Sequence, residues 1–228
     1  GSTDNTMTYG SNISSYNNVQ YHLPADLLPY STTFAVGITP GGAGGSANAS
    51  SHSVNGDVTG DMTQYKLTTA PIDGLSVQAS YYSFGEMGAG DNRQEQEGGS
   101  ISANYSIGQF SLGYGETIHA PAQKTNVGAA AAVVTDYYEN QGFSIGFAVN
   151  DNLSVSFTEE NSEINRKSKA TATDAITRTD VEMEIQTIDV AYTMGGATFS
   201  ISTSDATNDS YTTGDDSSEH IFAMSLAF

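Results

Sequence analysis

The chain has 228 residues, no cysteine, no tryptophan and a formal net charge of -19 at pH 7. Without cysteine, a disulfide framework and a thiolate metal site are excluded. The charge argues against nucleic acid or an anionic membrane surface as a partner, because both would repel the chain. No run of about 18 apolar residues occurs, which excludes a transmembrane helix.

Strands are predicted wherever bulky apolar residues alternate with small or polar ones, because successive side chains of a strand point to opposite faces. In chain order, short turns join pairs of such segments near residues 25–31, 71–74, 108, 150–152 and 195–196. The last segment, HIFAMSLAF, places Phe222, Met224, Leu226 and Phe228 on one face and small residues on the other. The whole pattern predicts about eleven strands.

The connections between these strands alternate in length. Long polar segments lie between the short turns, near residues 40–62, 85–99, 119–134, 160–179 and 205–218. One end of the sheet therefore carries short turns and the other long loops. A soluble sandwich with Greek-key connections gives no reason for this sorting, whereas an antiparallel up-and-down sheet does.

The two faces of the predicted strands suggest their environment. One face is bulky and apolar, whereas the other is mostly Ser, Thr, Gly, Ala, Asn and Gln. A bilayer requires strands of about 9 to 11 residues with an apolar outside and every backbone group paired, which a closed barrel provides. We therefore predict an all-β fold, a transmembrane antiparallel up-and-down β-barrel, with residues 18–228 supplying its strands.

The strand count bears on the start of the chain. Bacterial barrels of this kind have an even number of strands, with both termini at the short-turn end. A count of about eleven leaves two alternatives, namely that an odd number of strands precedes this segment or that the count is wrong by one.

Several segments resemble one known family. The Phe-terminated strand IFAMSLAF, together with NNVQYHLPADLLPYSTTFAVG and YKLTTAPIDGLSVQASYYSFG, is similar to the general porins of Gram-negative bacteria, especially marine alphaproteobacteria. The resemblance implies a homotrimer of 16-stranded, water-filled barrels in the outer membrane, in contact with lipid and lipopolysaccharide. It also implies that the terminal Phe is read as an assembly signal.

In that family the third loop folds inward and narrows the pore. The resemblance implies that residues 1–17, with Asp4, Asn5 and Tyr9, are all or part of this constriction loop, and that five strands precede it. The remaining residues, 18–228, would then be the C-terminal strands of a single barrel.

Candidate pore-lining residues follow from the alternation. If Met183 and Ile185 face lipid, Glu182 and Glu184 face inward, and a change of phase near Thr187 turns Asp189 inward too. The same polar face holds Gln20, His22, Lys66, Gln78 and Asn104. Inward carboxylates would concentrate cations. The alternative is that the glutamates lie near the loop end and are simply solvated.

Catalytic and metal-binding motifs have little support. The four histidines lack zinc-ligand spacing, and neither a nucleophile elbow nor a Walker loop is present. We therefore predict no enzyme activity and no required cofactor. The loop from Ser204 to Glu219 offers weak calcium candidates, since carboxylate oxygens are the ligands that Ca²⁺ prefers: Asp205, Asp209, Asp215, Asp216 and Glu219. A solvated surface loop is the alternative.

The predicted function is passive diffusion of small hydrophilic solutes and ions, with a preference for cations, through an outer-membrane porin. The main alternative is a non-conducting structural or adhesive surface barrel whose long acidic loops bind partners or calcium. A third alternative is a soluble β-sandwich or lectin-like binder.

Overall fold

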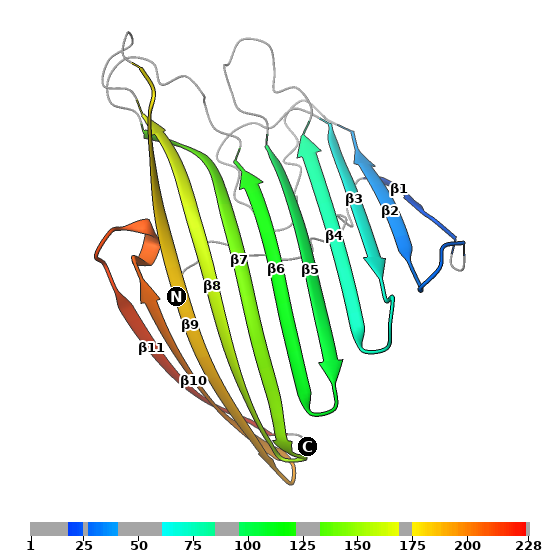
Figure 1. Cartoon of the computed structure of the whole chain (residues 1–228), viewed down its shortest axis with the longest axis vertical. Coiled ribbons are helices and arrows are strands. Elements are labelled where there is room, and N and C mark those ends of the chain that lie inside the picture. Colours follow the sequence, from blue (N-terminus) through cyan, green and yellow to red (C-terminus); the bar gives the residue numbers. More distant parts are fainter. Residues whose placement is uncertain are drawn as a thin grey trace.

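A computed structural model describes residues 18–24, 27–40, 61–84, 96–121, 133–168 and 175–226. These residues form one antiparallel sheet in which each of eleven strands pairs with the next along the chain (Figure 1). The predicted all-β, antiparallel, up-and-down arrangement is therefore confirmed, and the eleven strands of the described residues match the predicted number. Among the described residues, no helix is long and apolar enough to cross a membrane.

The strands lengthen toward the middle and the C-terminal half of the sheet. The longest, β7 and β9, have 18 residues each. In order, the elements are β1 Val19–His22, β2 Thr33–Thr39, β3 Met62–Thr69, β4 Leu75–Phe84, β5 Glu97–Ile107, β6 Phe110–Ala120, β7 Val133–Asn150, β8 Leu153–Ser168, β9 Thr177–Met194, β10 Ala197–Thr207, the 3₁₀ turn η2 Asp209–Tyr211 and β11 Ser217–Leu226.

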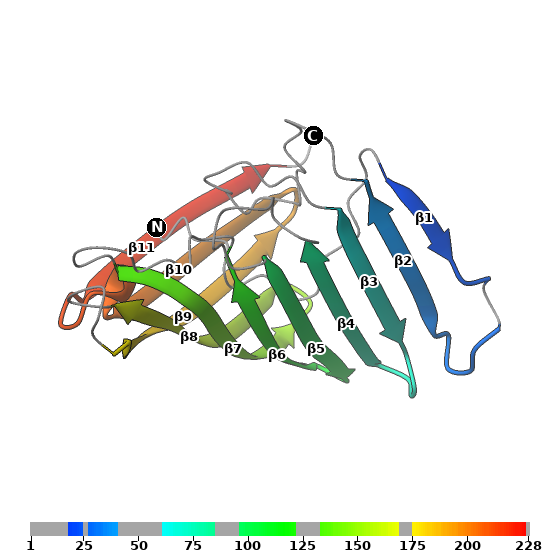
Figure 2. The ribbon, with the colours of Figure 1, turned by 90° about the horizontal axis from the view of Figure 1, so that it is seen from above.

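The sheet is strongly curved, with β1 at one edge and β11 at the other (Figure 2). No pairing joins these two edge strands in the described part of the chain, so the sheet does not close into a barrel. A curved sheet of this kind has a concave and a convex face. The register assigns every strand residue to one of them, because residues directly opposite each other share a face.

The short turns occupy one end of the sheet, as predicted (Figure 1). Gly108 and Gly195 adopt φ values of 58° and 62°, the left-handed conformation that tight hairpin turns need. In the turn between β7 and β8, the Asn150 side chain accepts hydrogen bonds from the backbone N–H groups of Asn152 and Leu153. Turn chemistry thus fixes these hairpins locally.

The concave face is polar, and part of it is buried. We define it by the row of paired residues Gln78, Ser102, Gly115, Gly142 and Glu160, which runs from β4 to β8. The buried polar residues of this face include Gln64, Ser102, Thr117, His119, Asn140 and Ser162. Buried apolar residues lie on the same face near the loop end, among them Met62, Phe84, Ile164 and Met183.

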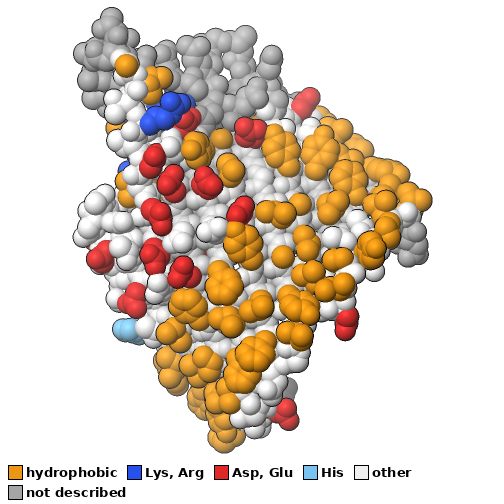
Figure 3. Space-filling view, in the orientation of Figure 1, with side chains coloured by type: hydrophobic (Ala, Val, Ile, Leu, Met, Phe, Trp, Pro, Cys, Tyr) orange, Lys and Arg blue, Asp and Glu red, His pale blue; other side chains and the backbone are white. Residues whose placement is uncertain are grey.

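The convex face carries the residues that alternate with these, and it has two zones (Figure 3). An apolar zone covers most of the face, and its aromatic rings stack across strands, as Phe34, Tyr65 and Tyr81 do at centroid distances of 6.5 Å. An acidic zone occupies the loop half of β7, β8 and β9. The register assigns to it Glu139, Glu159, Glu163, Asp180, Glu182 and Glu184.

Candidate functional site

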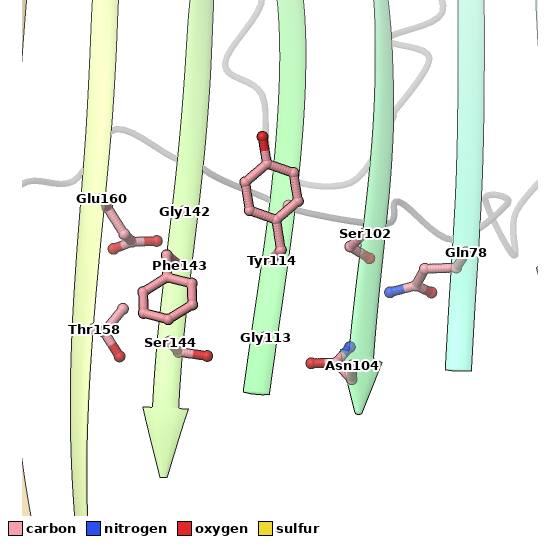
Figure 4. Close-up of a pocket in the computed structure, with 11 residues that line it drawn as sticks. Gln78, Ser102, Asn104, Gly113, Tyr114, Gly142, Phe143, Ser144, Thr158 and Glu160 are labelled. Atoms are coloured by element: carbon pink, nitrogen blue, oxygen red, sulfur yellow. The ribbon is translucent and has the colours of Figure 1, made fainter. Parts of the chain in front are cut away.

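A polar hollow of about 300 Å³ lies against the middle of the sheet. Five adjacent strands, β4 to β8, supply its wall, and their polar side chains lie side by side across it (Figure 4). These side chains are amides, hydroxyls and one carboxylate: Gln78, Ser102, Asn104, Ser144, Thr158 and Glu160. Together they present both donors and acceptors, as a water-filled or solute-bearing space requires.

Glycines make room for these side chains. A Cβ atom at Gly113 would lie 2.4 Å from Ser144 Oγ and 3.2 Å from Asn104 Oδ1, so the neighbouring polar groups lie over the bare backbone. Gly146 is approached in the same way by Ser111 Oγ, also at 2.4 Å. Of these two glycines, Gly113 lines the hollow, and its missing side chain leaves room there for Ser144 and Asn104.

One group in the hollow has an unused hydrogen-bonding capacity. Ser102 is 6% exposed, and its Oγ has no hydrogen-bond partner within the described part of the chain. A buried hydroxyl without a protein partner can be satisfied by water where the site is polar and large enough. The hollow meets both conditions.

Six of the predicted pore-lining residues share the concave face: Gln20, His22, Lys66, Gln78, Asn104 and Asp189. His22 Nε2 and Gln20 Oε1 are 2.9 Å apart on β1, and Lys66 lies opposite Ala35 and Ser80. On β9, Asp189 accepts a hydrogen bond of 3.5 Å from Ser156 Oγ. Only Gln78 and Asn104 of the six line the hollow.

Glu182 and Glu184 lie on the opposite face, so the prediction that they share a face with the other six residues is wrong. Strands β8 and β9 pair continuously from Leu153 to Ser168 without a register shift, and the predicted change of phase near Thr187 does not occur. The concave face of β9 therefore carries Met183, which is 1% exposed, and the glutamates point to the convex acidic zone. An apolar residue is stable there because Tyr211 and Ile164 cover it.

An aromatic and polar network that the sequence did not reveal lies at the loop end of the concave face. Tyr82 on β4 has its hydroxyl 2.6 Å from His119 Nδ1 on β6. The His119 ring stacks on Tyr138 of β7 at 6.2 Å, and Tyr138 lies 5.6 Å from the ring of Tyr211. Strand alternation alone could place the first three residues on one face, but it gives no indication of Tyr211.

Two of the acidic candidates for calcium accept hydrogen bonds from serine hydroxyls of β11. Ser217 Oγ donates to Asp209 Oδ2 at 2.6 Å, and Ser218 Oγ donates to Asp205 Oδ1 at 2.7 Å. The Ser217 hydrogen bond lowers the pKa of the Asp209 carboxyl. Within the described residues, no three carboxylate or imidazole groups lie close enough together to hold a metal ion. This holds for all five candidates, Asp205, Asp209, Asp215, Asp216 and Glu219. Calcium binding here stays a prediction.

The apolar residues of the last strand lie on the convex face. Phe222, Met224 and Leu226 pair with Ile201, Phe199 and Ala197 of β10, and Phe222 is 69% exposed. The terminal Phe228 and the constriction-loop candidates Asp4, Asn5 and Tyr9 lie outside the described residues.

Comparison with known proteins gives no assignment. No protein-family model matches the chain, and no curated protein matches it.

Proposed function

We propose that this sheet is the wall of a water-filled pore in a Gram-negative outer membrane, which passes small hydrophilic solutes and ions by passive diffusion. The observation that carries the proposal is the opposite chemistry of the two faces. The concave face has an unbroken row of small polar groups from β5 to β10, namely Asn104, Gly113, Ser144, Thr158, Thr187 and Ser204.

The convex face supports a lipid environment. Ile101, Leu112, Ile145 and Ile201 lie on this face by register and are each at least 36% exposed. Figure 3 shows apolar side chains gathered over neighbouring strands. Soluble proteins rarely expose contiguous apolar patches larger than a few hundred Å². Burial of such side chains in hydrocarbon would contribute about 25 cal/mol for each Å² removed from water.

The lengths of the strands fit a barrel that rises above the membrane. About 9 to 11 tilted residues span a bilayer, whereas β7 and β9 have 18. In our proposal the short-turn half of each long strand crosses the membrane and the acidic zone stands in water beyond it. This places the carboxylates of Glu139, Glu163 and Glu182 outside the hydrocarbon, where charge costs little.

The open edges of the sheet require partners. Exposed backbone groups on β1 and β11 would be left unpaired in lipid, and each would cost several kcal/mol. We propose that further strands join β11 to β1 in a closed barrel. From the resemblance to porins, we expect this barrel to have sixteen strands, to assemble as a homotrimer and to contact lipid and lipopolysaccharide.

The described charges on the concave face support only a modest preference for cations. Glu160, Asp189 and Glu219 are acidic, whereas Lys66 and Arg166 are basic. With Glu182 and Glu184 on the convex face, the excess of carboxylate in the pore is smaller than the sequence suggested. The proposed transport involves no turnover and requires no cofactor.

A liposome-swelling assay tests the proposal. Liposomes that contain the detergent-purified, folded protein should swell in small sugars at rates that fall steeply as the sugar becomes larger, whereas heat-denatured protein should give none. A folded protein that inserts but leaves the liposomes impermeable would overturn the proposal and favour the non-conducting surface barrel. Full dispersal as a single species without detergent would favour the soluble alternative.

A further inference from the structure

The segment 208–216, between β10 and β11, does not extend the sheet but turns over its concave face. We call it the β10–β11 flap. Its Tyr211 is 5% exposed and packs against Ile164 of β8 and Met183 of β9. The Tyr211 ring also reaches Tyr138 of β7, at a centroid distance of 5.6 Å. The flap therefore crosses β9 and rests on the two strands beyond it.

The tyrosine is held by polar contacts as well as by packing. Its hydroxyl lies 2.7 Å from Ser162 Oγ, and Ser162 in turn donates to Asn140 Oδ1. Asn140 Nδ2 donates to Thr117 Oγ1 at 2.7 Å, which links the flap to β6. Arg166 Nη1 donates to the backbone carbonyl of Tyr211 at 3.5 Å. The Tyr211 side chain is thus held by direct contacts with residues of β7, β8 and β9.

The flap has a fixed shape of its own. Asn208, Ser210 and Tyr211 have φ values of 54°, 55° and 57°, a conformation that residues other than glycine rarely adopt. The Asn208 side chain stabilises it by donating to the carbonyl of Glu182 at 2.9 Å and accepting from the N–H of Gly214 at 2.8 Å. Such strain persists only where the surrounding structure determines the conformation.

The flap is acidic. Asp215 and Asp216 are exposed, and Asp209 lies beside them in the same turn, with its backbone N–H donating to the carbonyl of Asp215 at 2.6 Å. No Lys or Arg occurs between residues 179 and 228. The flap itself therefore carries only negative charges, and Arg166 of β8 lies against its backbone.

We propose that the β10–β11 flap narrows the loop-side mouth of the pore, and that Tyr211 is the positioning residue that holds it there. The flap sets the size of the solutes that pass, and its carboxylates favour cations at the entrance. This inference rests on the proposed function. The flap is a different segment from residues 1–17, the predicted constriction loop, and it lies against strands β7 to β9.

Single-channel recording in planar bilayers tests the role of Tyr211. Tyr211→Ala should raise the conductance above the wild-type value and admit polyethylene glycols that the wild-type pore excludes. The reason is that the substitution removes the contacts that hold the flap against β7, β8 and β9. Tyr211→Phe keeps the packing of the ring but loses the hydroxyl contact with Ser162, so its conductance should lie between those of wild type and Tyr211→Ala. Thr213→Ala changes an exposed residue of the same segment and is the matched control.

A second variant keeps the test decisive if Tyr211→Ala does not fold. Replacement of residues 209–214 by a Gly-Ser segment of equal length removes the flap and leaves the strands intact, and it should give the same increase in conductance and exclusion size. Conductance that stays at or below the wild-type value in folded protein of either variant would overturn the inference alone. A wild-type protein that does not conduct would overturn the proposed function itself.

Discussion

Asn140 on β7 donates a hydrogen bond of 2.7 Å to Thr117 Oγ1 on β6, at a position where Asn140 is only 1% exposed. Its Oδ1 accepts from Ser162 on β8, so this one amide connects three strands. A buried polar group that loses its hydrogen-bond partner destabilises the fold, because the free-energy cost of removing it from water is no longer offset. The network therefore makes the loop end of the concave face sensitive to single substitutions.

Asn140→Ala should lower the free energy of unfolding by about 1 to 3 kcal/mol, because it removes the buried hydrogen bonds that this amide makes to Thr117 and Ser162. Gln141→Ala, one residue further on and exposed on the convex face, should cost no more than about 0.5 kcal/mol. Equilibrium denaturation in detergent micelles measures both values. Equal losses for the two variants would contradict the network.

The faces of β11 give a matched pair of charge insertions. Met224 lies on the convex face opposite Phe199, and Ala223 lies on the concave face opposite Ser200. Met224→Arg should cost roughly 2 to 4 kcal/mol in lipid vesicles, because it places a cation against hydrocarbon. Ala223→Arg should fold in similar yield to wild type and shift the ion selectivity away from cations. If the two variants fold equally well in lipid, the assignment of the convex face to lipid is wrong.

An ion pair ties the loop ends of β7 and β8 together. Lys167 Nζ lies 2.7 Å from Asp136 Oδ1, and the two side chains are 12% and 18% exposed. Asp136→Asn should lower the free energy of unfolding by about 1.5 to 3 kcal/mol, the range for hydrogen bonds to charged groups.

Arg178→Gln is the control, because Arg178 is 61% exposed and lies 3.5 Å from the same carboxylate. This change should cost about 0 to 1 kcal/mol, as exposed pairs do. A Lys167 and Asp136 double-mutant cycle with no coupling energy would contradict the pairing.

The flap should loosen in acid through Asp209. Its pKa is lowered, first by the hydrogen bond from the Ser217 hydroxyl, so the folded state favours the carboxylate. The stabilisation is therefore complete above the unfolded pKa of about 3.9, and it is lost as the pH falls through the lower folded value. Other acidic side chains and His220 are neighbours of Asp209 in the sequence, so Asp209→Asn is the necessary comparison. The difference in unfolding free energy between wild type and Asp209→Asn should shrink between pH 6 and pH 2. A constant difference would contradict this role.

Local pattern was sufficient to predict the sheet. The alternation in HIFAMSLAF predicts the strand and the faces that Phe222 and Met224 occupy, and the short turns predict which strands pair. Both signals are local because hairpin register depends on turn chemistry and on a period of two. The edges of the sheet are different, since local pattern does not show what pairs with β1 or β11.

The error at Glu182 and Glu184 has a physical cause. Strand β9 carries apolar residues on both faces, with Met183 and Ile185 on one and Ile188 on the other. Alternation cannot choose between such faces, and the sequence suggested a change of phase where none exists. The deciding contact is Tyr211, which covers Met183 from a segment 28 residues further along the chain. Contacts of this range are not visible in a strand pattern.

Planar-bilayer recording of the protein, purified in detergent from the membranes of cells that produce it, tests the central proposal most directly. We expect stable, stepwise, ohmic conductance, with a reversal potential in a salt gradient that indicates a modest preference for cations. A bilayer that stays silent with correctly folded, inserted protein would contradict the assignment of the concave face as the wall of a pore.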